Sequence, residues 1–552
     1  MNPWFWMRNK SAAIHRSTLA VVLATLSGIS PVLAQSSAPS QSNAQAPISA
    51  IDWLDNSQNL AALPTRPPLR PGTSSVWDET PVAETILIPE VTTRPLNAPK
   101  AGAVGLLPRS VTGLPATLWQ GSLAPALIRK VNRLDVDAIP AMQSLLYTLL
   151  LTEADPPMQD AAGMAFLLAR IDKLIEIGAV DPALALTERA GPTTHPDLFS
   201  RWFDLTLLTG DEHRACKTMR ERPSLAPSGS ALTFCRAAQG QYDLATLTFG
   251  NAAALGLLTP GEESLLRLYL DPDLAEETPQ LPPPAKVTPL TFRLSEAIGQ
   301  PLRTQGLPRA YAMTDLRGVS GWRAEIEAAE RLTQSGALAE NRLLGIYTSR
   351  RPSASGEPWD RVEAVQALDT LLEDAQTAKS GQLDDPSLAT QLPITWDALR
   401  KVALEVPFAR LWGETLAGLN LTGTAATTVF EIAMLSPQYE SLAAKLPHPD
   451  ARTKFLAALA GGQPEKASAP DELTRAVQRG FDPETEIPAS IRLDLTQGKL
   501  GEAILSAMTL ITQAAEGATK DIAPALATLR SVGLEDTARR TAIQLILLDR
   551  QT

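Results

Sequence analysis

The sequence predicts an all-α protein: an α-solenoid of antiparallel helical hairpins, preceded by a signal peptide and a proline-rich disordered linker. From about residue 116 onward, apolar residues recur at i, i+3, i+4 and i+7, which is the spacing of an amphipathic helix. Almost no stretch alternates apolar and polar residues with the period of two that is typical of a strand. The nearest candidate, 84–88, falls inside the linker. We therefore expect no sheet in the body of the protein.

Residues 1–34 have the organisation of a signal peptide. Three basic residues precede a short apolar run, Leu19–Leu26, and a small residue stands at Ala34. This pattern predicts cleavage between Ala34 and Gln35. The alternative is an uncleaved anchor, but the apolar run is short for a membrane span of about 20 residues. We expect an exported, periplasmic chain without a membrane span in its mature form.

The charge balance of the chain is acidic. Lys and Arg total 49 and Asp and Glu total 60, which gives a net charge of −11. The expected mature chain loses three basic and no acidic residues, so its net charge is −14. A nucleic-acid-binding protein needs a basic face. We therefore expect no nucleic-acid partner.

Residues 35–115 form the linker. They contain 12 prolines among Ser, Gln, Ala and Thr. A segment of this composition cannot bury enough apolar surface to offset its ordering entropy, so we expect it to be extended and disordered. Two apolar islands, 48–54 and 104–108, interrupt it. They either dock on a partner or on the protein's own body, or they are inert.

The helical body repeats itself in two places, 116–270 and 471–552. A glycine is followed five residues later by a small residue, and four residues after that by another small or apolar one. The glycines and their partners are Gly178 with Ala183 and Thr187, Gly210 with Ala215 and Met219, Gly240 with Ala245 and Phe249, Gly498 with Ala503 and Ala507, and Gly533 with Ala538 and Ala542. A glycine permits a tight turn between antiparallel helices, and the alanine lets the second helix approach the first closely.

This pattern resembles the tetratricopeptide repeat, a helix–turn–helix unit of about 34 residues. The resemblance covers roughly 155–260 and 485–552, and the family's Trp and Leu-Gly signature is mostly absent. It implies a helical scaffold and names no ligand. Generic helical hairpins without kinship are the alternative, and they predict the same architecture.

The remaining segments are divided by prolines. A proline-rich connector is expected at 271–290, and a middle helical region at 291–446. Within that region, 379–393 is expected to be a loop. A further loop is expected at 447–470, before the last hairpins.

Cys216 and Cys235 are the only cysteines in the chain. An isolated pair in an exported protein is expected to form a disulfide. In the repeat register, Cys216 lies in the second helix of one hairpin and Cys235 in the first helix of the next, so the two side chains can meet. Two buried free thiols are the alternative.

The sequence offers no catalytic or cofactor motif. There is no HExxH, CxxC, GxxxxGK[ST] or GxSxG, and the four histidines are scattered. We therefore expect no catalytic residues, no cofactor and no metal site.

One polar constellation stands out in 348–363. Arg350 and Arg351 precede a Pro/Ser/Gly loop, and Trp359 and Arg361 open the next helix. Arginine binds carboxylates with two hydrogen bonds, and Trp is a frequent interface anchor, so these four residues are candidates for binding a partner. The alternative is an interhelical loop in which Trp359 packs as a hydrophobic staple.

These observations favour a non-enzymatic periplasmic scaffold that binds a protein partner in the cell envelope. The alternative is a regulator of peptidoglycan synthesis or remodelling. A cell-wall lytic enzyme is less favoured, because the helical body continues to Thr552 and leaves no separate catalytic domain.

Overall fold

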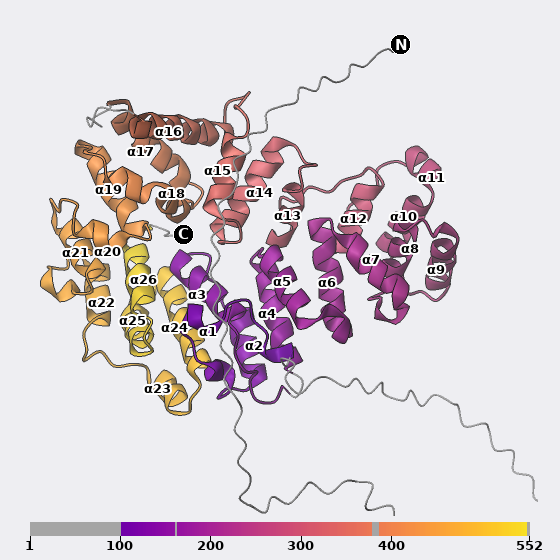
Figure 1. Cartoon of the computed structure of the whole chain (residues 1–552), viewed down its shortest axis with the longest axis horizontal. Helices are drawn as coiled ribbons and strands as arrows, with labels where there is room; N and C mark the ends of the chain where they lie inside the picture. The colour runs from indigo at the N-terminus through magenta and orange to yellow at the C-terminus, as the bar shows by residue number, and fades with distance from the viewer. Residues whose placement is uncertain (1–100, 161–162, 378–385, 549–552) are drawn as a thin grey trace, which may run out of the picture. The chain divides into compact units, whose positions relative to one another are not determined.

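A computed structural model describes residues 101–160, 163–377 and 386–548, which belong to the second of the chain's two units, Thr92–Thr552. The expected signal peptide, its expected cleavage site and most of the expected linker lie outside these residues. The described part consists of helices α1 to α26 and short 3-10 helices, with two isolated bridges and no strand (Figure 1). The all-α prediction is confirmed there. Within the same ranges, every helix is too short or too polar to span a membrane.

The first group of helices begins earlier than the sequence predicts. It comprises η1 (Ala101–Ala103), α1 (Arg109–Thr112), η2 (Ala116–Trp119), α2 (Ala124–Arg133) and α3 (Pro140–Leu151). The expected linker extends to residue 115, but Val104 is only 4% exposed and Leu114 only 8%. This part of the linker prediction is wrong.

Arg170 explains why these residues are packed. Its buried guanidinium donates to the carbonyls of Leu150, Val104 and Thr152 at 2.7, 2.9 and 3.0 Å. The N–H groups of Leu106 and Leu107 add hydrogen bonds to the carbonyl of Leu151. The Arg170 side chain and these main-chain hydrogen bonds together attach the island at 104–108 to the end of α3.

A run of hairpins follows. It comprises α4 (Met164–Glu176), α5 (Val180–Ala190), η3 (Pro192–Thr194), α6 (Pro196–Thr209), α7 (Glu212–Glu221), η4 (Pro223–Leu225), α8 (Gly229–Ala238) and α9 (Tyr242–Ala254). Each helix from α4 to α9 packs against the next one in the chain.

The predicted glycine–alanine register is present at all five turns. The glycines adopt φ values between +73° and +87°, the left-handed region that favours glycine. The alanine five residues after each glycine is fully buried: Ala183, Ala215, Ala245, Ala503 and Ala538. The turns lie between α4 and α5, α6 and α7, α8 and α9, α23 and α24, and α25 and α26.

After α9 the chain turns back. The next elements are α10 (Pro260–Leu270), α11 (Pro272–Glu277), α12 (Pro289–Ala297), η5 (Arg309–Tyr311), α13 (Ala312–Asp315), α14 (Trp322–Gln334), α15 (Glu340–Thr348) and α16 (Trp359–Thr377). Helix α10 packs on α8, α9 and α12, and α12 packs on α6. The expected connector 271–290 thus includes the short helix α11.

The last group completes the described chain. It comprises α17 (Pro386–Arg400), α18 (Glu405–Ala417), α19 (Gly423–Leu435), α20 (Tyr439–Ala443), α21 (Ala451–Ala460), η6 (Pro464–Lys466), α22 (Glu472–Gly480), α23 (Ala489–Thr496), α24 (Leu500–Ala515), η7 (Thr519–Asp521), α25 (Ile522–Ser531) and α26 (Glu535–Leu547).

Two expected loops are partly helical in this group. Pro393 lies inside α17, so the loop expected at 379–393 does not extend that far. The stretch 447–470 contains α21, whose Phe455 and Leu456 are buried. Prolines flank α21 rather than interrupt it, which is why the composition of this stretch suggests a loop.

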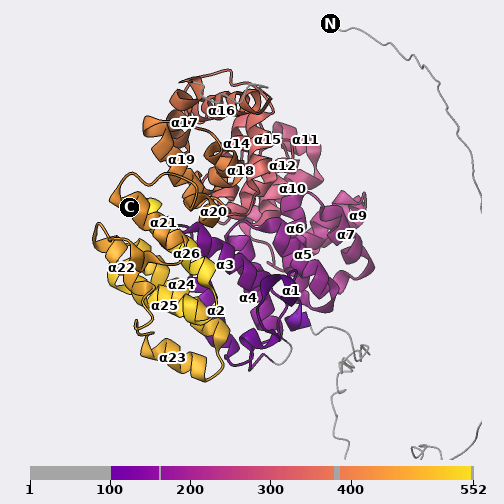
Figure 2. The same ribbon diagram turned by 60° about the vertical axis from the view of Figure 1, so that its left-hand side comes forward.

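The first and last helices of the described chain pack against each other. Helix α26 packs on α3 and α24 packs on α2, and the two groups lie side by side in both views (Figure 1, Figure 2). The N–H of Ala141 donates to Oε1 of Gln544 at 2.7 Å, and Nζ of Lys130 donates to Oγ of Ser506 at 2.8 Å. One continuous apolar core runs from Ala101 to Leu548, and a second, smaller one lies among α6, α7, α8, α10 and α12.

Candidate functional site

The four predicted partner-binding residues do not form one surface. Arg350 and Arg351 are exposed at the end of α15, and the carbonyl of Arg350 accepts a hydrogen bond from Nε2 of Gln366 at 2.6 Å. Their guanidinium groups have no hydrogen bond or ion pair within the described ranges. They remain available to a partner.

Arg361 is not available to a partner. Its side chain is 4% exposed, and it donates two hydrogen bonds of 2.8 Å to the carboxylate of Glu330 on α14. Tyr347 donates to the same carboxylate at 2.7 Å. Burial, and then the Glu330 charge, raise the pKa of Tyr347 far above its usual value. Arg361 therefore ties α16 to α14, and its guanidinium is engaged within the chain.

Trp359 is half-buried and packs against Trp322, with ring centroids 5.1 Å apart. The indole N–H of Trp322 donates to the carbonyl of Ile346 at 3.0 Å. This arrangement fits the packing alternative for Trp359. The pair fixes the first turns of α14 and α16 against each other.

A large cavity runs along α14, beside this pair. Its volume is about 1170 Å³. The walls come from the segment 301–305, the turn before α14, one side of α14, and Glu357, Pro358 and Arg361. The sequence-predicted segment thus forms one wall of the cavity, through residues other than Arg350 and Arg351.

The carboxylates of this cavity are all engaged. Asp315 accepts hydrogen bonds from Ser320 at 2.7 Å and from Thr304. The other four bind arginines: Glu296 to Arg317, Glu327 to Arg323, Glu330 to Arg361, and Glu357 to Arg361.

Two arginines of the cavity, by contrast, form no ion pair with a carboxylate. Arg303 is exposed and makes no hydrogen bond or ion pair in the described part of the chain. Arg331 donates to the main-chain carbonyls of Thr304 and Leu307, at 3.0 and 2.8 Å. Burial, and then the neighbouring charge of Arg309, lower the pKa of Arg331. Arg303 and Arg331 therefore have no carboxylate as an ion-pair partner, while the lining as a whole carries five carboxylates and four arginines.

The sequence offered no signal for Arg303 or Arg331. Both lie in ordinary amphipathic or loop contexts, and their proximity arises because α14 packs beside the segment 301–307. Arg323, next to Trp322, lines the same cavity.

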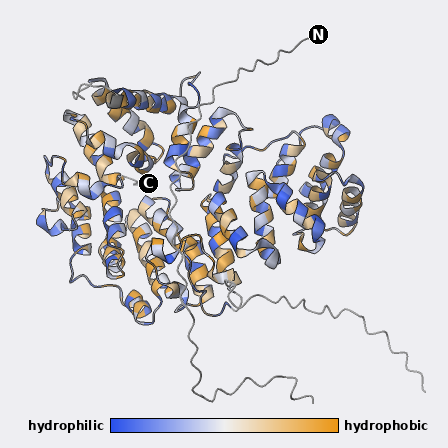
Figure 3. Ribbon diagram, in the orientation of Figure 1, coloured by the Kyte–Doolittle hydropathy of each residue, from blue (hydrophilic) through white to orange (hydrophobic). Residues whose placement is uncertain are grey.

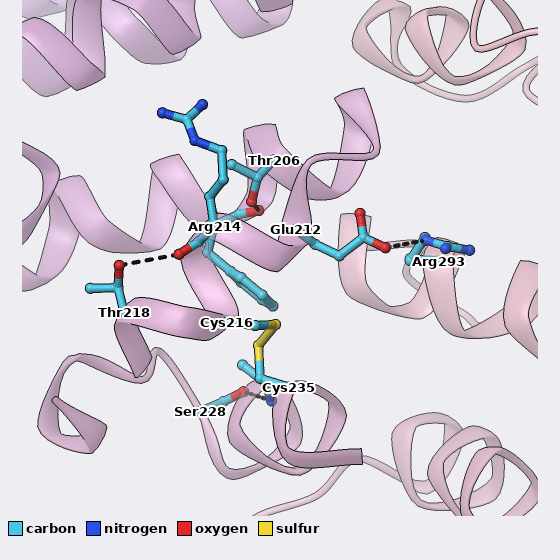
Figure 4. The surroundings of a disulfide bond; sticks show 10 residues. Thr206, Glu212, Arg214, Cys216, Thr218, Ser228, Cys235 and Arg293 are labelled. Carbon is cyan, nitrogen blue, oxygen red and sulfur yellow. Dashed lines mark hydrogen bonds and ion pairs between the residues drawn. A yellow bond between two sulfur atoms is a disulfide. The ribbon is translucent and has the colours of Figure 1, made fainter. Parts of the chain in front are cut away.

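The predicted cysteine pair lies away from this cavity, in the smaller core. Cys216 on α7 and Cys235 on α8 are at disulfide distance, with Cα atoms 4.9 Å apart, and both side chains are buried (Figure 4). Beside them, Glu212 pairs with Arg293 of α12 at 2.9 Å. The pair joins two consecutive hairpins, as the repeat register predicts.

Across the described residues, no group of three or more His, Cys, Asp or Glu side chains could hold a metal ion. The arrangement along α14 can bind a ligand by shape, by hydrogen bonds and through its arginines. No family model, no curated protein and no solved structure matches this chain.

Proposed function

We propose that this chain is a non-enzymatic, exported helical scaffold that binds a segment of a protein partner in the cell envelope. The observation that carries the proposal is the cavity of about 1170 Å³ along α14. Its volume suits a few side chains of a bound segment, and its walls combine apolar groups such as Val319 and Leu302 with polar ones.

The two arginines of the cavity that lack a carboxylate partner favour a segment that carries a carboxylate. Arg303 is free to form a bidentate pair, and Arg331 lines the same cavity with only main-chain acceptors. A carboxylate bound at either guanidinium would gain charge-assisted hydrogen bonds.

The same geometry supports binding rather than catalysis. General acid–base chemistry needs a carboxylate or an imidazole that is free to exchange a proton with substrate. Each carboxylate of the cavity is already held by an arginine or by hydroxyl groups. These pairs fix the walls of the site.

Kinship with the tetratricopeptide repeat is part of the proposal. It is supported by the glycine turn and the fully buried alanine that recur at five hairpins. Export to the periplasm is supported by the signal-like sequence of 1–34 and by a cysteine pair at disulfide distance.

The experiment is site-specific photo-crosslinking in intact cells. A photoreactive amino acid at Gln305, an exposed wall residue, should capture a discrete envelope protein, and the adduct should fall several-fold when Arg303→Glu is added. The control position is Arg492, which is exposed on α23 and remote in sequence from the cavity. Equal adducts from both positions would contradict the proposal. If the purified protein cleared a peptidoglycan gel, the result would instead point to a cell-wall lytic enzyme.

A further inference from the structure

A small cavity lies where α7, α8 and α9 meet, and we call it the α7–α9 pocket. Its volume is about 130 Å³, which suits a single side chain rather than a whole small molecule. Its walls are partly apolar, since Met219, Leu232 and Leu244 line it together with both cysteines. Because Cys216 belongs to α7 and Cys235 to α8, the cysteine pair links two of the walls.

The charged residues of this pocket are both basic. Arg220 and Arg236 line it, and none of the residues that line it is acidic. Arg220 is exposed and makes no hydrogen bond or ion pair within the described ranges. Arg236 donates through Nη1 to the carbonyl of Leu244 at 3.4 Å and to the hydroxyl of Thr248. In the described part of the chain its Nε and Nη2 have no partner, and this edge of a guanidinium can bind a carboxylate with two hydrogen bonds.

An exposed row of leucines begins at the pocket. Leu244 lines the pocket and is 47% exposed, and Leu247 and Leu255 follow on α9 at 60% and 72%. The three lie within about 80° of one another around a helix of 3.6 residues per turn. Apolar residues line much of α9 (Figure 3). We call these three leucines the α9 stripe.

The stripe is exposed because the run of hairpins stops at α9. Ala245 and Ala252 of this helix are buried, and α9 packs mainly against α8. The chain then turns back, since α10 packs on α8, α9 and α12, and α12 packs on α6 (Figure 1). Terminal units of helical-repeat proteins need a polar outer side for solubility. An apolar outer side such as this one therefore marks an interaction site.

Arg236 connects the pocket to the stripe. Both of its hydrogen-bond partners, Leu244 and Thr248, belong to α9, and they lie within about 40° of each other around that helix. Positive charge therefore borders the leucines at the end that adjoins the pocket. Asp243 is the one acidic residue of α9, and it lies about 100° around the helix from Leu244 and does not line the pocket.

We propose that the α7–α9 pocket and the α9 stripe together bind an acidic amphipathic helix of a protein partner. One apolar side chain of that helix would enter the pocket, and the others would cover the leucines. Its carboxylates would pair with Arg220 and Arg236. The inference goes beyond the cavity along α14, since it assigns a second site on other helices. It stands whether or not that cavity binds anything.

The charges at this site disfavour the other occupants. A cationic helix would meet Arg220 and Arg236, with no carboxylate in the pocket to receive it. A second copy that paired through the same surface would bring the arginines of both copies together. A short helix responds only to charges within about 8 Å, whereas a bilayer faces a whole side of the molecule. An anionic bilayer would therefore meet Asp243 and more of a chain whose net charge is −11.

The test uses the chain without its expected signal peptide, 35–552, and labelled peptides of about 18 residues with leucines at i, i+3, i+4 and i+7. One peptide carries glutamates beside its apolar face, its matched partner carries lysines at the same positions, and the remaining residues are glutamine. Fluorescence anisotropy should show saturable binding of the glutamate peptide. The lysine peptide should bind at least about tenfold more weakly.

Two variants with matched controls test the two halves of the site. Leu244→Gln should weaken binding of the glutamate peptide by more than about tenfold, because it changes both the pocket wall and the start of the stripe. Leu493→Gln, at an exposed leucine of α23, should leave binding unchanged. Arg220→Glu should lower the ratio of the two peptide affinities by about tenfold, whereas Arg492→Glu on α23 should not change it. A partial loss of folding would lower both affinities and leave their ratio unchanged.

Several outcomes would overturn the proposal. One is equal binding of the two peptides by the wild type, and another is no saturable binding of the glutamate peptide at about 100 μM. An unchanged affinity ratio in Arg220→Glu is a third. Dimerisation of the wild type that Leu247→Gln abolishes would assign the stripe to a second copy, and binding to anionic vesicles that the same change abolishes would assign it to a membrane. Photo-crosslinking at Gln305 reports on the α14 cavity separately, so the two proposals fail independently.

Discussion

At the scale of single residues, Asp204 on α6 is held where its neutral form is favoured. Burial raises the pKa of its carboxyl group to about 7; the Arg201 guanidinium opposes this shift and the Asp172 carboxylate adds to it. Arg201 is already paired with Asp172 at 2.8 Å, so it compensates Asp204 poorly. The native state therefore binds a proton that the unfolded state releases near pH 4.

This shift predicts a pH dependence with a definite sign. Between about pH 4 and pH 7 the native state holds more protons than the unfolded state, so stability falls as pH rises through this window. Asp204→Asn should remove that loss. In urea unfolding, the free energy of unfolding of the variant should rise relative to that of the wild type by about 1–2 kcal/mol between pH 5 and pH 8. Asp397→Asn, at an exposed position on α17, should show no such change. A constant difference for Asp204→Asn across this range would contradict the prediction.

The burial of individual arginines could not be predicted from the sequence. Nothing local distinguishes Arg361 from the exposed Arg350 and Arg351. Its burial depends on Glu330, 31 positions away, which reaches it only because α14 and α16 begin side by side at Trp322 and Trp359. Arg170 is a similar case, since its three carbonyl partners come from two segments.

At the scale of elements, the hairpins were predictable because their determinants are local. A left-handed glycine and a buried alanine five residues later lie within one turn and one helix. When such a glycine is replaced, the loss of unfolding free energy should come from backbone strain rather than from a lack of space around the new side chain.

Gly498→Ala isolates that cost. Gly498 adopts φ +73°, and a Cβ there would meet nothing within 4 Å. The loss of unfolding free energy should therefore be about 1 kcal/mol or somewhat more, from backbone strain. Gly345→Ala in α15 is the matched control, because its position is equally open and helical. The free energy of unfolding of that variant should rise by about 0.5–1 kcal/mol. A gain at both positions would contradict the role of Gly498 in the turn.

The cysteine pair joins two such elements. Closing a loop with a sequence separation of 19 should stabilise the protein by about 3 kcal/mol in the chain-entropy model. The variant with Cys216→Ala and Cys235→Ala should therefore unfold at a lower urea concentration. Its free energy of unfolding should fall by about 3 kcal/mol or less. A thiol count on unfolded, unreduced protein from the periplasm should find none. Two free thiols would show that the bond does not form.

At the scale of the whole molecule, the contact between the first and last groups of helices could not be predicted from the sequence. Periodicity identifies the buried face of a helix but not the helix that covers it. The sequence predicts a row of hairpins, and the packing of α26 on α3 and α24 on α2 adds a link between residues about 380–400 positions apart. In the same region, Gly501 of α24 lies directly against Trp119 of η2.

Gly501→Ala should therefore act on both ends of the described chain at once. A Cβ at Gly501 would lie 2.3 Å from Cζ3 of Trp119, whose ring is 1% exposed, and 3.0 Å from the carbonyl of Leu118. Neither the buried ring nor the main chain can yield easily, so we expect a loss of about 1–3 kcal/mol.

The control for this change is Gly250→Ala in α9, where a Cβ meets nothing within 4 Å and the effect should be neutral or slightly stabilising. Because one apolar core connects α2 and α3 to α24 and α26, the loss should appear as a shift of a single transition, with circular dichroism and tryptophan fluorescence coinciding. An unchanged midpoint in Gly501→Ala would mean that the terminal helices do not pack as tightly as this contact requires. Two separated transitions in the wild type would mean that they dock without sharing a cooperative core.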